Sequence, residues 1–487
     1  MEKRVAVVLP NLLGAAFAVL LLASSAVHAQ STAPADEKDQ EIELLKSQIK
    51  QLEGRVRSLE ELAPKVKVID RKVDAQEETQ LANIDAERAK ALEMPIIKAS
   101  EQGFRLASPN DDYRIRFGGV LQTNSRFFTS GDDKNISSTF YINKARPIIS
   151  GAVGKYFEYQ ITPDFGQGKT ILQDAWINFG YSALAQLQAG KYKASVNLER
   201  LQADPYLEFI QRSEVQNLVP NRDIGIQLNG LLLDRRLNYQ LALMNGVPNN
   251  TASSDFDNND AKDFIGRVFL TPFKKSEYEW LKGFGAGVAG TYGTESGNTT
   301  SVYKTWGQST WFNYNNGVTA DGARERLDGQ AYYYWRHLGL MAEYAQDHHT
   351  LRMTSKNANL THSFTDNGYM AQISYYLTGE NASYGQVAPL RPFDPLEFEG
   401  LGALSVAARI SNVATDTNQF RLGFADPGVA AKTATEVAFG INWILNNNVK
   451  YSIDYADIFF RDGASTNGNV TDRPAESVFE TQLQIAF

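Results

Sequence analysis

The chain has 487 residues, 43% of them hydrophobic and 21% charged. Its mean hydropathy of -0.34 argues against a polytopic helical membrane protein, which needs repeated long apolar runs. The formal charge of -8, from 48 Lys and Arg against 56 Asp and Glu, argues against general affinity for nucleic acid. The absence of cysteine excludes disulfides, thiolate metal sites and cysteine nucleophiles.

The N-terminus has the pattern of an export signal. Lys3 and Arg4 precede an apolar run over residues 12 to 27, and Val27-His28-Ala29 fits a signal peptidase site. We therefore expect a signal peptide over residues 1 to 29. A retained membrane anchor is the alternative, but the charged run that follows favours cleavage. The mature chain is then expected in the periplasm, in an outer membrane or outside the cell.

A heptad pattern follows, which predicts an α-helical coiled coil over residues 36 to 63. β-Branched residues at the a positions and leucine at the d positions favour parallel dimers. The stretch Arg55-Val-Arg-Ser-Leu-Glu60 instead resembles a motif of short trimeric coiled coils, so both states stay open. A single amphipathic helix lying on its own barrel is the third interpretation. We expect Pro64 to end the seam and residues 64 to 95 to form a helical spacer. The seam consists of Ile42, Leu45, Ile49, Leu52, Val56 and Leu59.

After Gly103 the hydrophobic period changes from about 3.6 to 2, which is the period of a β-strand. Between Tyr113 and Phe127 one face is aliphatic and aromatic, while the other carries Arg114, Arg116 and Arg126. The same alternation recurs at residues 157–162, 237–243, 369–378, 449–455 and 479–487. Repeated segments of about ten residues, separated by short turns and long loops in alternation, are typical of a transmembrane β-barrel.

We therefore predict an all-β fold, a transmembrane antiparallel β-barrel over residues 96 to 487 behind the N-terminal helical extension. From Gly103 to the end there are 385 residues, which suit about 16 to 18 strands and an aqueous channel. A soluble β-sandwich is disfavoured because no second amphipathic set remains to cover the apolar faces. The terminal Phe487 also looks like the C-terminal aromatic residue that the outer-membrane assembly machinery recognises.

The sequence offers little for catalysis, and we predict no enzyme, no cofactor and no metal site. The mature chain has only four histidines, His337, His348, His349 and His362, and lacks a Gly-x-Ser-x-Gly elbow. His348-His349 would need further ligands nearby to hold a metal ion. Paired acids such as Asp132-Asp133 are better explained as solvated loop charges.

The charge is unevenly distributed along the predicted barrel. Residues 103–222 contain 14 Lys and Arg against 11 Asp and Glu, whereas residues 223–487 contain 20 against 28. Cations that line a narrow pore attract anions. The alternative, that they pair with acids such as Glu158 and Asp164 and give little net field, stays equally open. Strand parity predicts these lumen cations: Arg114, Arg116, Arg126, Lys144, Arg146, Arg267 and Arg409.

Several short runs, in order along the chain, together resemble the phosphate-selective porin O and P family. The resemblance covers nearly the whole predicted barrel, and a helical N-terminal extension is common in that family. The runs include Phe117-Gly-Gly-Val-Leu-Gln-Thr123, Lys144-Ala-Arg-Pro147, Phe157-Glu-Tyr-Gln-Ile-Thr-Pro-Asp-Phe-Gly166, Leu172-Gln-Asp-Ala-Trp176, Gly190-Lys-Tyr-Lys193, Asn221-Arg-Asp-Ile-Gly225 and Ala407-Ala-Arg409.

The resemblance implies a trimer of 16-stranded barrels in the outer membrane of a Gram-negative bacterium. It also implies a third extracellular loop, here between Lys193 and Arg222, that folds inward as a constriction. By the same resemblance Asp174 would orient the anion-binding side chains, which are Lys144, Arg146, Lys191 and Lys193. Arg200, Arg212 and Arg222 would line the loop, although acidic residues lie among them.

We therefore expect a passive, trimeric, water-filled porin for small anions, with phosphate or pyrophosphate as leading substrates. Its expected partners are these anions, outer-membrane lipid, further copies of the chain and the assembly machinery, and no nucleic acid. A general, weakly selective porin is the first alternative. A barrel-anchored structural protein that uses the coiled coil is the second, and a barrel enzyme using His348 and His349 is the third.

Overall fold

The computed structural model describes residues 35–130, 137–252, 259–298, 300–355, 358–396 and 400–487. The chain divides into two compact units, residues 1–92 and residues 93–487. The predicted signal peptide lies outside the described residues, and its assignment stays a prediction.

The N-terminal unit contains one long helix, α3 (Ala35–Glu93). The predicted break at Pro64 is wrong, because α3 continues through that residue. Proline removes one hydrogen-bond donor and crowds the preceding turn, but good helix formers on both sides carry the helix across it. The heptad residues, Ile49 and Leu52 among them, are about half exposed along this single helix. No helix of the described residues is long and apolar enough to cross a membrane.

The second unit begins with a hairpin that the sequence pattern did not reveal. Strands β1 (Ile96–Ser100) and β2 (Gly103–Ala107) pair with each other. β2 then pairs with the start of β3, where Phe104 lies opposite Phe117. The hairpin therefore begins at residue 96, the predicted start of the barrel domain, and adds to the wall below the first barrel strand.

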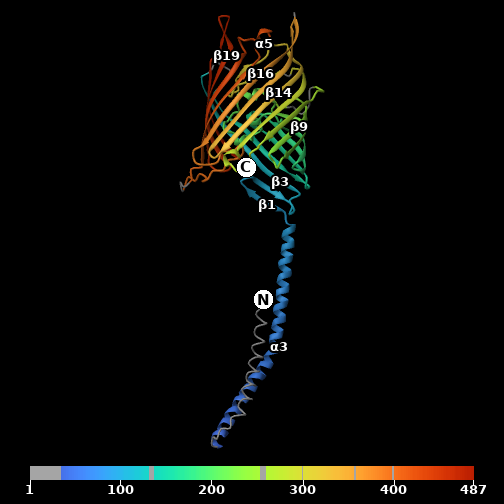
Figure 1. Cartoon of the computed structure of the whole chain (residues 1–487), viewed down its shortest axis with the longest axis vertical. Helices are drawn as coiled ribbons and strands as arrows, with labels where there is room; N and C mark the ends of the chain where they lie inside the picture. Colours follow the sequence, from blue (N-terminus) through green and yellow to red (C-terminus); the bar gives the residue numbers. More distant parts are fainter. Residues whose placement is uncertain (1–34, 131–136, 253–258, 299, 356–357, 397–399) are drawn as a thin grey trace. The chain divides into compact units, whose positions relative to one another are not determined.

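Sixteen antiparallel strands of the described chain form a closed barrel, as predicted (Figure 1). Each strand pairs with its neighbours in sequence, and the last strand pairs with the first. The strands are β3 (Arg114–Ser130), β4 (Thr139–Val153), β5 (Phe157–Asp164), β6 (Ile171–Ser182), β7 (Ala185–Lys193), β8 (Arg222–Leu232), β9 (Leu237–Met244), β10 (Asp263–Leu270), β11 (Phe284–Gly297), β14 (Val318–Trp335), β15 (Leu338–Ser355), β16 (Ala358–Tyr376), β17 (Ala403–Ala414), β18 (Ala431–Ile444), β19 (Val449–Thr466) and β21 (Glu476–Ala486).

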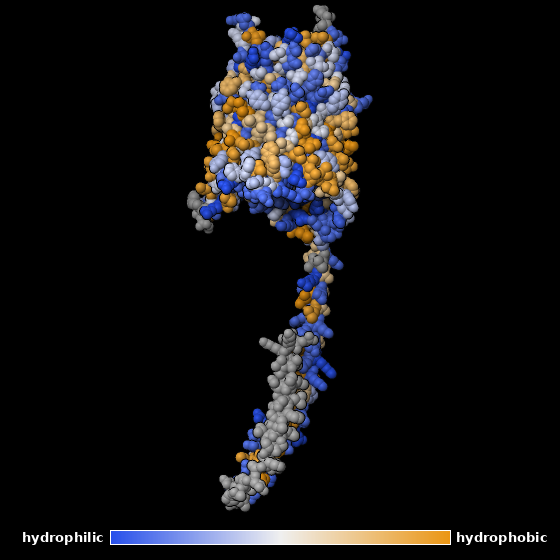
Figure 2. Space-filling model, viewed as in Figure 1, coloured by the Kyte–Doolittle hydropathy of each residue, from blue (hydrophilic) through white to orange (hydrophobic). Residues whose placement is uncertain are grey.

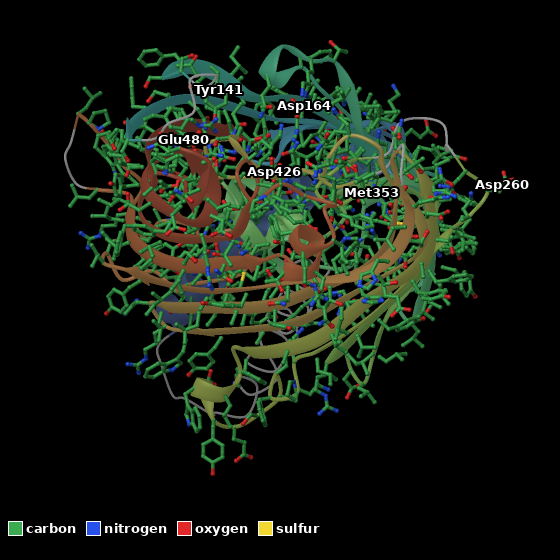
Figure 3. All side chains as sticks on the ribbon, turned by 90° about the horizontal axis from the view of Figure 1, so that it is seen from above. Tyr141, Asp164, Asp260, Met353, Asp426 and Glu480 are labelled. Carbon is green, nitrogen blue, oxygen red and sulfur yellow. The ribbon has the colours of Figure 1, made fainter. Side chains whose placement is uncertain are left out.

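The two faces of the wall follow the alternation read from the sequence. In β3, Leu121 and Phe127 are exposed on the outside, whereas Gln122, Asn124 and Arg126 are buried inside. Exposed apolar side chains of every barrel strand form a belt, and Figure 2 shows this belt between two hydrophilic ends on the face in view. Seen from above, side chains from the wall and the loops fill the interior (Figure 3). The chain thus presents hydrocarbon to its surroundings and polar groups to its lumen.

The connections differ at the two ends of the barrel. At one end, which we call the turn end, most are short, such as residues 183–184 and 445–448. Two connections there are longer, residues 271–283 from β10 to β11 and residues 377–402 from β16 to β17, and the sequence analysis identified neither. The loop end carries longer connections with short elements of their own: η2 (Gly166–Gly168), α4 (Leu198–Leu201), η3 (Asp204–Tyr206), η4 (Glu214–Leu218), β12 (Tyr303–Lys304), β13 (Thr310–Phe312), α5 (Thr417–Arg421) and β20 (Asn469–Asp472). One further 3-10 turn, η5 (Glu279–Leu281), lies at the turn end.

The barrel closes at the C-terminus. The backbone N–H of Gly119 donates to the carbonyl of Phe487 at 2.9 Å, and the N–H of Phe487 donates to Gly119 at 3.0 Å. The approach is close, because a Cβ on Gly118 would lie 2.5 Å from the Phe487 carbonyl oxygen. Position 118 in this seam therefore requires glycine, which has no side chain. Recognition of Phe487 by the assembly machinery stays a prediction.

Gly118→Val should weaken the closing seam, because the added carbon atoms force the last strand away from the first. Overpacking of this kind costs about 1–3 kcal/mol. When samples are heated in SDS to increasing temperatures, the variant barrel should unfold at a lower temperature than the parent barrel. Gly54→Ala is the matched control, since nothing lies within 4 Å of a Cβ at Gly54. Equal heat resistance of the Gly118→Val variant and the parent would contradict the close approach.

Candidate functional site

The third connection at the loop end, residues 194–221, folds into the barrel, and we call it L3. Its backbone donors are taken up by carboxylates of distant strands. The N–H of Glu199 donates to Glu343 of β15 at 3.1 Å, and that of Ile210 donates to Asp454 of β19 at 2.6 Å. Asn197 caps the short helix α4 by accepting from the N–H of Arg200. L3 is therefore bound to wall strands far along the sequence from β7 and β8, which it joins.

A buried ion-pair network fixes the middle of L3. Arg409 of β17 lies 3.0 Å from Glu199 of the loop and 2.8 Å from Glu436 of β18. Its guanidinium also lies over the ring of Phe209, 4.4 Å from the ring centroid. Arg409 was predicted to line the lumen, but its side chain has no exposed surface. It holds the loop against the wall instead.

The fifth connection at the loop end, residues 298–317, packs on L3, and we call it L5. Its β12–β13 hairpin is held by carboxylates, as the indole of Trp306 donates to Glu480 at 2.8 Å. The backbone N–H of Trp306 donates to Glu214 of L3 at 3.1 Å. Tyr141 donates to the same Glu480 at 2.5 Å, and both are labelled in Figure 3. L5 therefore joins L3 in narrowing the lumen.

The two loops and the wall enclose a polar cavity of about 360 Å³, which we call the constriction cavity. Seven cationic side chains but only two carboxylates line it among the described residues. The remaining lining is mainly amides and hydroxyls. The cations are Lys144, Arg146, Lys169, Arg200, Arg212, Arg222 and Lys304, and the carboxylates are Asp204 and Glu214.

Asp204 of L3 lies at the centre of these cations. Its carboxylate lies 3.3 Å from Lys144 and 2.6 Å from Arg212, and it also accepts from Arg146. Burial alone would raise the pKa of Asp204, but Lys144, Arg212 and Arg146 together hold that pKa well below its usual value. The carboxylate therefore stays ionised and takes up hydrogen bonds that the cations could otherwise offer to an anion.

Two further carboxylates lie behind the cavity. Asp164 accepts from Arg146 at 2.6 Å, and Asp174 accepts from Arg222 at 2.9 Å. Gln173, with its amide oxygen toward the arginines, accepts from Arg222 at 2.7 Å. Asp174 thus pairs with Arg222, whereas the resemblance implied that it orients Lys144, Arg146, Lys191 and Lys193.

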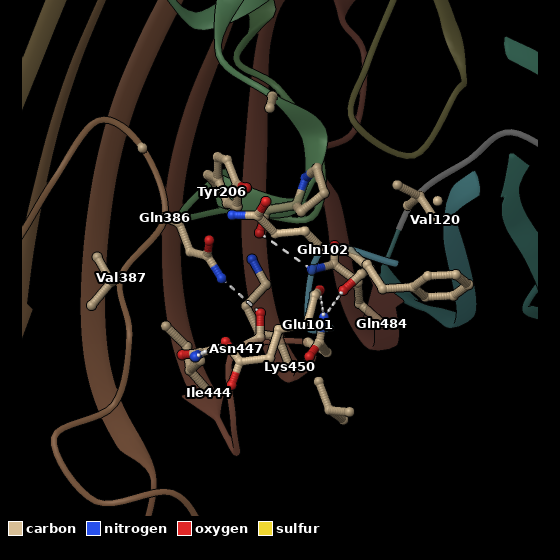
Figure 4. A pocket seen from close by; sticks show the side chains of 18 of the residues that line it. Glu101, Gln102, Val120, Tyr206, Gln386, Val387, Ile444, Asn447, Lys450 and Gln484 are labelled. Carbon is tan, nitrogen blue, oxygen red and sulfur yellow. Dashed lines mark hydrogen bonds between the residues drawn. The ribbon is translucent and has the colours of Figure 1, made fainter. Parts of the chain in front are cut away.

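A second cavity, of about 450 Å³, lies on the turn-end side of L3 (Figure 4). Gln386, from the long connection between β16 and β17, donates to the carbonyl of Asn447 at 2.8 Å. Glu101, from the turn between β1 and β2, accepts from the side chain of Asn447 at 2.5 Å. Lys450 donates to the carbonyl of Leu207 in L3 at 2.8 Å. Cavities therefore lie on both sides of the loop, and the one on the turn-end side has a mixed polar and apolar lining.

A family model for the phosphate-selective porin O and P family matches residues 121–487. The chain belongs to this family. Porin O of Pseudomonas aeruginosa is 22% identical over 427 residues, which cover 80% of this chain and 92% of that protein. The resemblance noted in the sequence is thereby confirmed.

Solved structures match the chain at low similarity. OmpT of Vibrio cholerae, in a trimer form, is 12% identical with a TM-score of 0.47, and the match covers 77% of this chain and all of that one. Salmonella typhi OmpF, in complex with daunomycin, is 14% identical with a TM-score of 0.46 over 77% of this chain and 99% of that one.

The protein is an outer-membrane porin of the Gram-negative type and a channel rather than an enzyme, as expected. The turn end of the barrel is then periplasmic and the loop end extracellular. His348 hydrogen-bonds Thr365, and His349 lies 3.1 Å from Asp347. Among the described residues no group of three or more His, Asp and Glu side chains is placed to hold a metal ion.

The other predicted site residues lie in three places: at L3, in the barrel wall and elsewhere in the lumen. Lys193 reaches L3, where it donates to the carbonyl of Gln202 at 2.8 Å. Lys191 is buried opposite Ala175 and Ile224, and it is not one of the side chains that line the constriction cavity. Three lumen arginines outside the constriction cavity have their own partners: Arg114 pairs with Glu158, Arg126 contacts Tyr141 and Glu480, and Arg267 donates to Gln240 and Gln330. Arg116 lines the second cavity, on the turn-end side of L3.

Three charged residues that line the cavity were not identified from the sequence. Lys169 follows the short turn η2, Lys304 belongs to L5, and Asp204 lies among hydrophobic residues of L3. Asp204 could have been found, because the sequence reading already placed the inward loop between Lys193 and Arg222. Lys304 could not, since no local pattern shows that L5 folds inward.

Arg409→Met should destabilise the porin and loosen L3, because it leaves Glu199 and Glu436 buried without their cation. Breaking a buried pair in this way costs about 3–5 kcal/mol. We expect a lower midpoint of thermal unfolding and a noisier single-channel current. The matched control is Arg352→Met, which removes an exposed arginine 3.4 Å from Asp321 and should cost at most about 1 kcal/mol. The same current noise in both variants would contradict the anchoring role.

Proposed function

We propose that the porin is a passive channel for small anions and that oxyanions of the phosphate class are its preferred solutes. The excess of seven cations over two carboxylates in the constriction cavity carries this proposal. The family's name points to phosphate, and the charges of this chain agree with that class of solute.

The field of the cavity favours anions for a physical reason. The cations lie between L3, L5 and the wall, where protein replaces most of the water and weakens screening. Lys144, Arg146 and Arg212 converge on one carboxylate, so their donors already point toward a common centre. An oxyanion that reaches this centre finds several charge-assisted donors at once.

Asp204 gives the cavity a built-in competitor for its solute. A passing oxyanion has to share donors with this carboxylate, so binding is moderated and the ion can leave again. A channel needs sites of such moderate strength, because a tight site would block conduction. Asp204 thus sets the balance between selectivity and flux.

A general, weakly selective porin is the second candidate. Asp164 and Asp174 each take up one arginine that would otherwise face the cavity. Nine amide side chains, among them Gln211 and Asn217, also line the cavity and favour no charge. This candidate predicts a weak anion preference without block by phosphate.

Arg146→Gln should weaken block of the chloride current by added phosphate. Loss of one charge-assisted hydrogen bond, about 1.5–3 kcal/mol, corresponds to roughly a ten- to hundredfold higher phosphate concentration for half block. Asp204→Asn should change the block in the opposite direction, because it frees the donors of Lys144 and Arg212. The measurement is single-channel current in a planar bilayer with phosphate titrated into chloride.

Arg352→Gln is the control, because it removes an equal charge from a residue that does not line the cavity. Unchanged block in both Arg146→Gln and Asp204→Asn would refute the site. A parent protein with little anion preference and no block would support the general porin.

We also propose that the porin is a trimer whose α3 helices form a coiled coil. In the described chain the seam residues Ile49, Leu52 and Val56 stay about half exposed, which a second and third copy would correct. A barrel-anchored structural role would use the same helices. Deletion of residues 36–93 that causes envelope defects while conductance stays normal would favour that role.

Leu52→Cys should give strong disulfide cross-linking between subunits, because a d position faces its copy across the seam. The chain has no cysteine, so the new thiol is the only one. Gly54→Cys, two residues further on the outer face of the helix, is the matched control. We expect several-fold more cross-linked product on a non-reducing gel at Leu52 than at Gly54, and a trimer mass by light scattering. Equal cross-linking at both positions would count against the seam.

A further inference from the structure

Three periplasmic turns form a connected patch on the rim of the barrel, which we call the basic rim. They are residues 233–236, 271–283 and 336–337. The N–H of Thr271 donates to the carbonyl of Arg236 at 2.7 Å, which joins the first two turns. The N–H of Tyr334 donates to the carbonyl of Gly283 at 3.1 Å, which joins the second to the strand that precedes the third. One continuous surface therefore extends over strands β8 to β15.

Aromatic side chains of the basic rim lie beside the lipid-facing wall. The ring of Phe273 packs on Phe284, with 6.1 Å between centroids. Phe284 is the register partner of Tyr333, and by parity both share the outer face with the exposed Val288 and Leu327. Tyr278 and Trp280 are 65% and 53% exposed. Aromatic residues at this position lie at the level of lipid headgroups.

The charge of the basic rim is opposite to that of the chain. Six cations stand against three acids, Asp234, Glu277 and Glu279, whereas the whole chain carries a formal charge of -8. Two of the acids are already paired, Asp234 with Lys275 and Glu279 with Lys282. Arg235 and Lys274 are exposed and form no ion pair within the described residues. The six cations are Arg235, Arg236, Lys274, Lys275, Lys282 and Arg336.

The cations also lie where a headgroup phosphate would be. Arg336 stacks over the ring of Trp335, 5.2 Å from its centroid, and Trp335 belongs by parity to the outer face. The guanidinium of Arg336 is thus held at the aromatic boundary of the membrane rather than in the lumen. Cations next to exposed aromatic rings match a phosphodiester above acyl chains, because the rings contact the apolar part and the cations contact the phosphate.

We propose that the basic rim binds an anionic phospholipid of the periplasmic leaflet. The rings at the outer wall favour a lipid over a free phosphate ion, which gains nothing from apolar contact. The proposal rests on the outer-membrane location of the barrel and is independent of anion selectivity in the lumen. The site is defined by Arg235, Lys274 and Arg336 together with the rings of Trp280 and Trp335.

The test compares lipid binding to the whole purified porin by native mass spectrometry, with phosphatidylglycerol and phosphatidylcholine of equal chain length as probes. The parent should bind phosphatidylglycerol more tightly. The triple variant Arg235→Gln, Lys274→Gln and Arg336→Gln should lose about a hundredfold of that affinity, because each surface cation contributes a factor of several. Its affinity for phosphatidylcholine should stay unchanged. Trp280→Ala should weaken binding of both lipids.

The matched control neutralises three cations of the same end outside the basic rim: Lys98→Gln, Lys155→Gln and Arg391→Gln. It should keep the preference for phosphatidylglycerol. Single-channel chloride conductance equal to that of the parent shows that each variant is folded. No preference in the parent, or an equal loss in the triple variant and the control, would overturn the proposal. Displacement of the lipid by millimolar inorganic phosphate would also overturn it, because it would indicate a site for the free ion.

Discussion

Backbone hydrogen bonding in a hydrocarbon medium is the constraint on which this structure depends. No water is available at the lipid-facing wall, so every strand has to pair on both sides, and only a closed barrel achieves that. Closure brings Gly119 and Phe487 together and leaves the wall without a free edge. It also sorts the side chains, since alternate residues face lipid and the others face a lumen that only polar groups, loops and water can fill.

The cations and the carboxylates of the lumen come largely from two different regions of the chain. The basic part, up to Arg222, supplies most cations of the constriction cavity. The acidic part supplies carboxylates on the inner face of later strands, such as Glu343, Asp454 and Glu480. These carboxylates accept from backbone and side-chain donors of L3 and L5. Part of the acidity of residues 223–487 thus serves to anchor the loops, and it coexists with a cationic constriction.

The sequence predicted the barrel and its two faces because strand parity is local information. Leu121 outside and Gln122 inside follow from position alone. It could not predict that Arg409 is buried under L3, because its partner Glu199 is 210 residues away. Parity gives the side of the wall on which a residue lies, and it gives no information on whether a loop covers that residue. The prediction at Pro64 failed for a different reason, because a single proline does not outweigh the helix-forming residues around it.

The closing seam also determines when the protein can fold. Gln122 of the first barrel strand hydrogen-bonds Gln484 of the last, across a sequence separation of 362 residues. From Val120 onward, β3 therefore has no second neighbour until the last strand of the chain is available. Non-local pairing of this kind is slow and leaves strand edges open to aggregation. The chain therefore exposes an unpaired strand edge and apolar strand faces until its last strand pairs with the first.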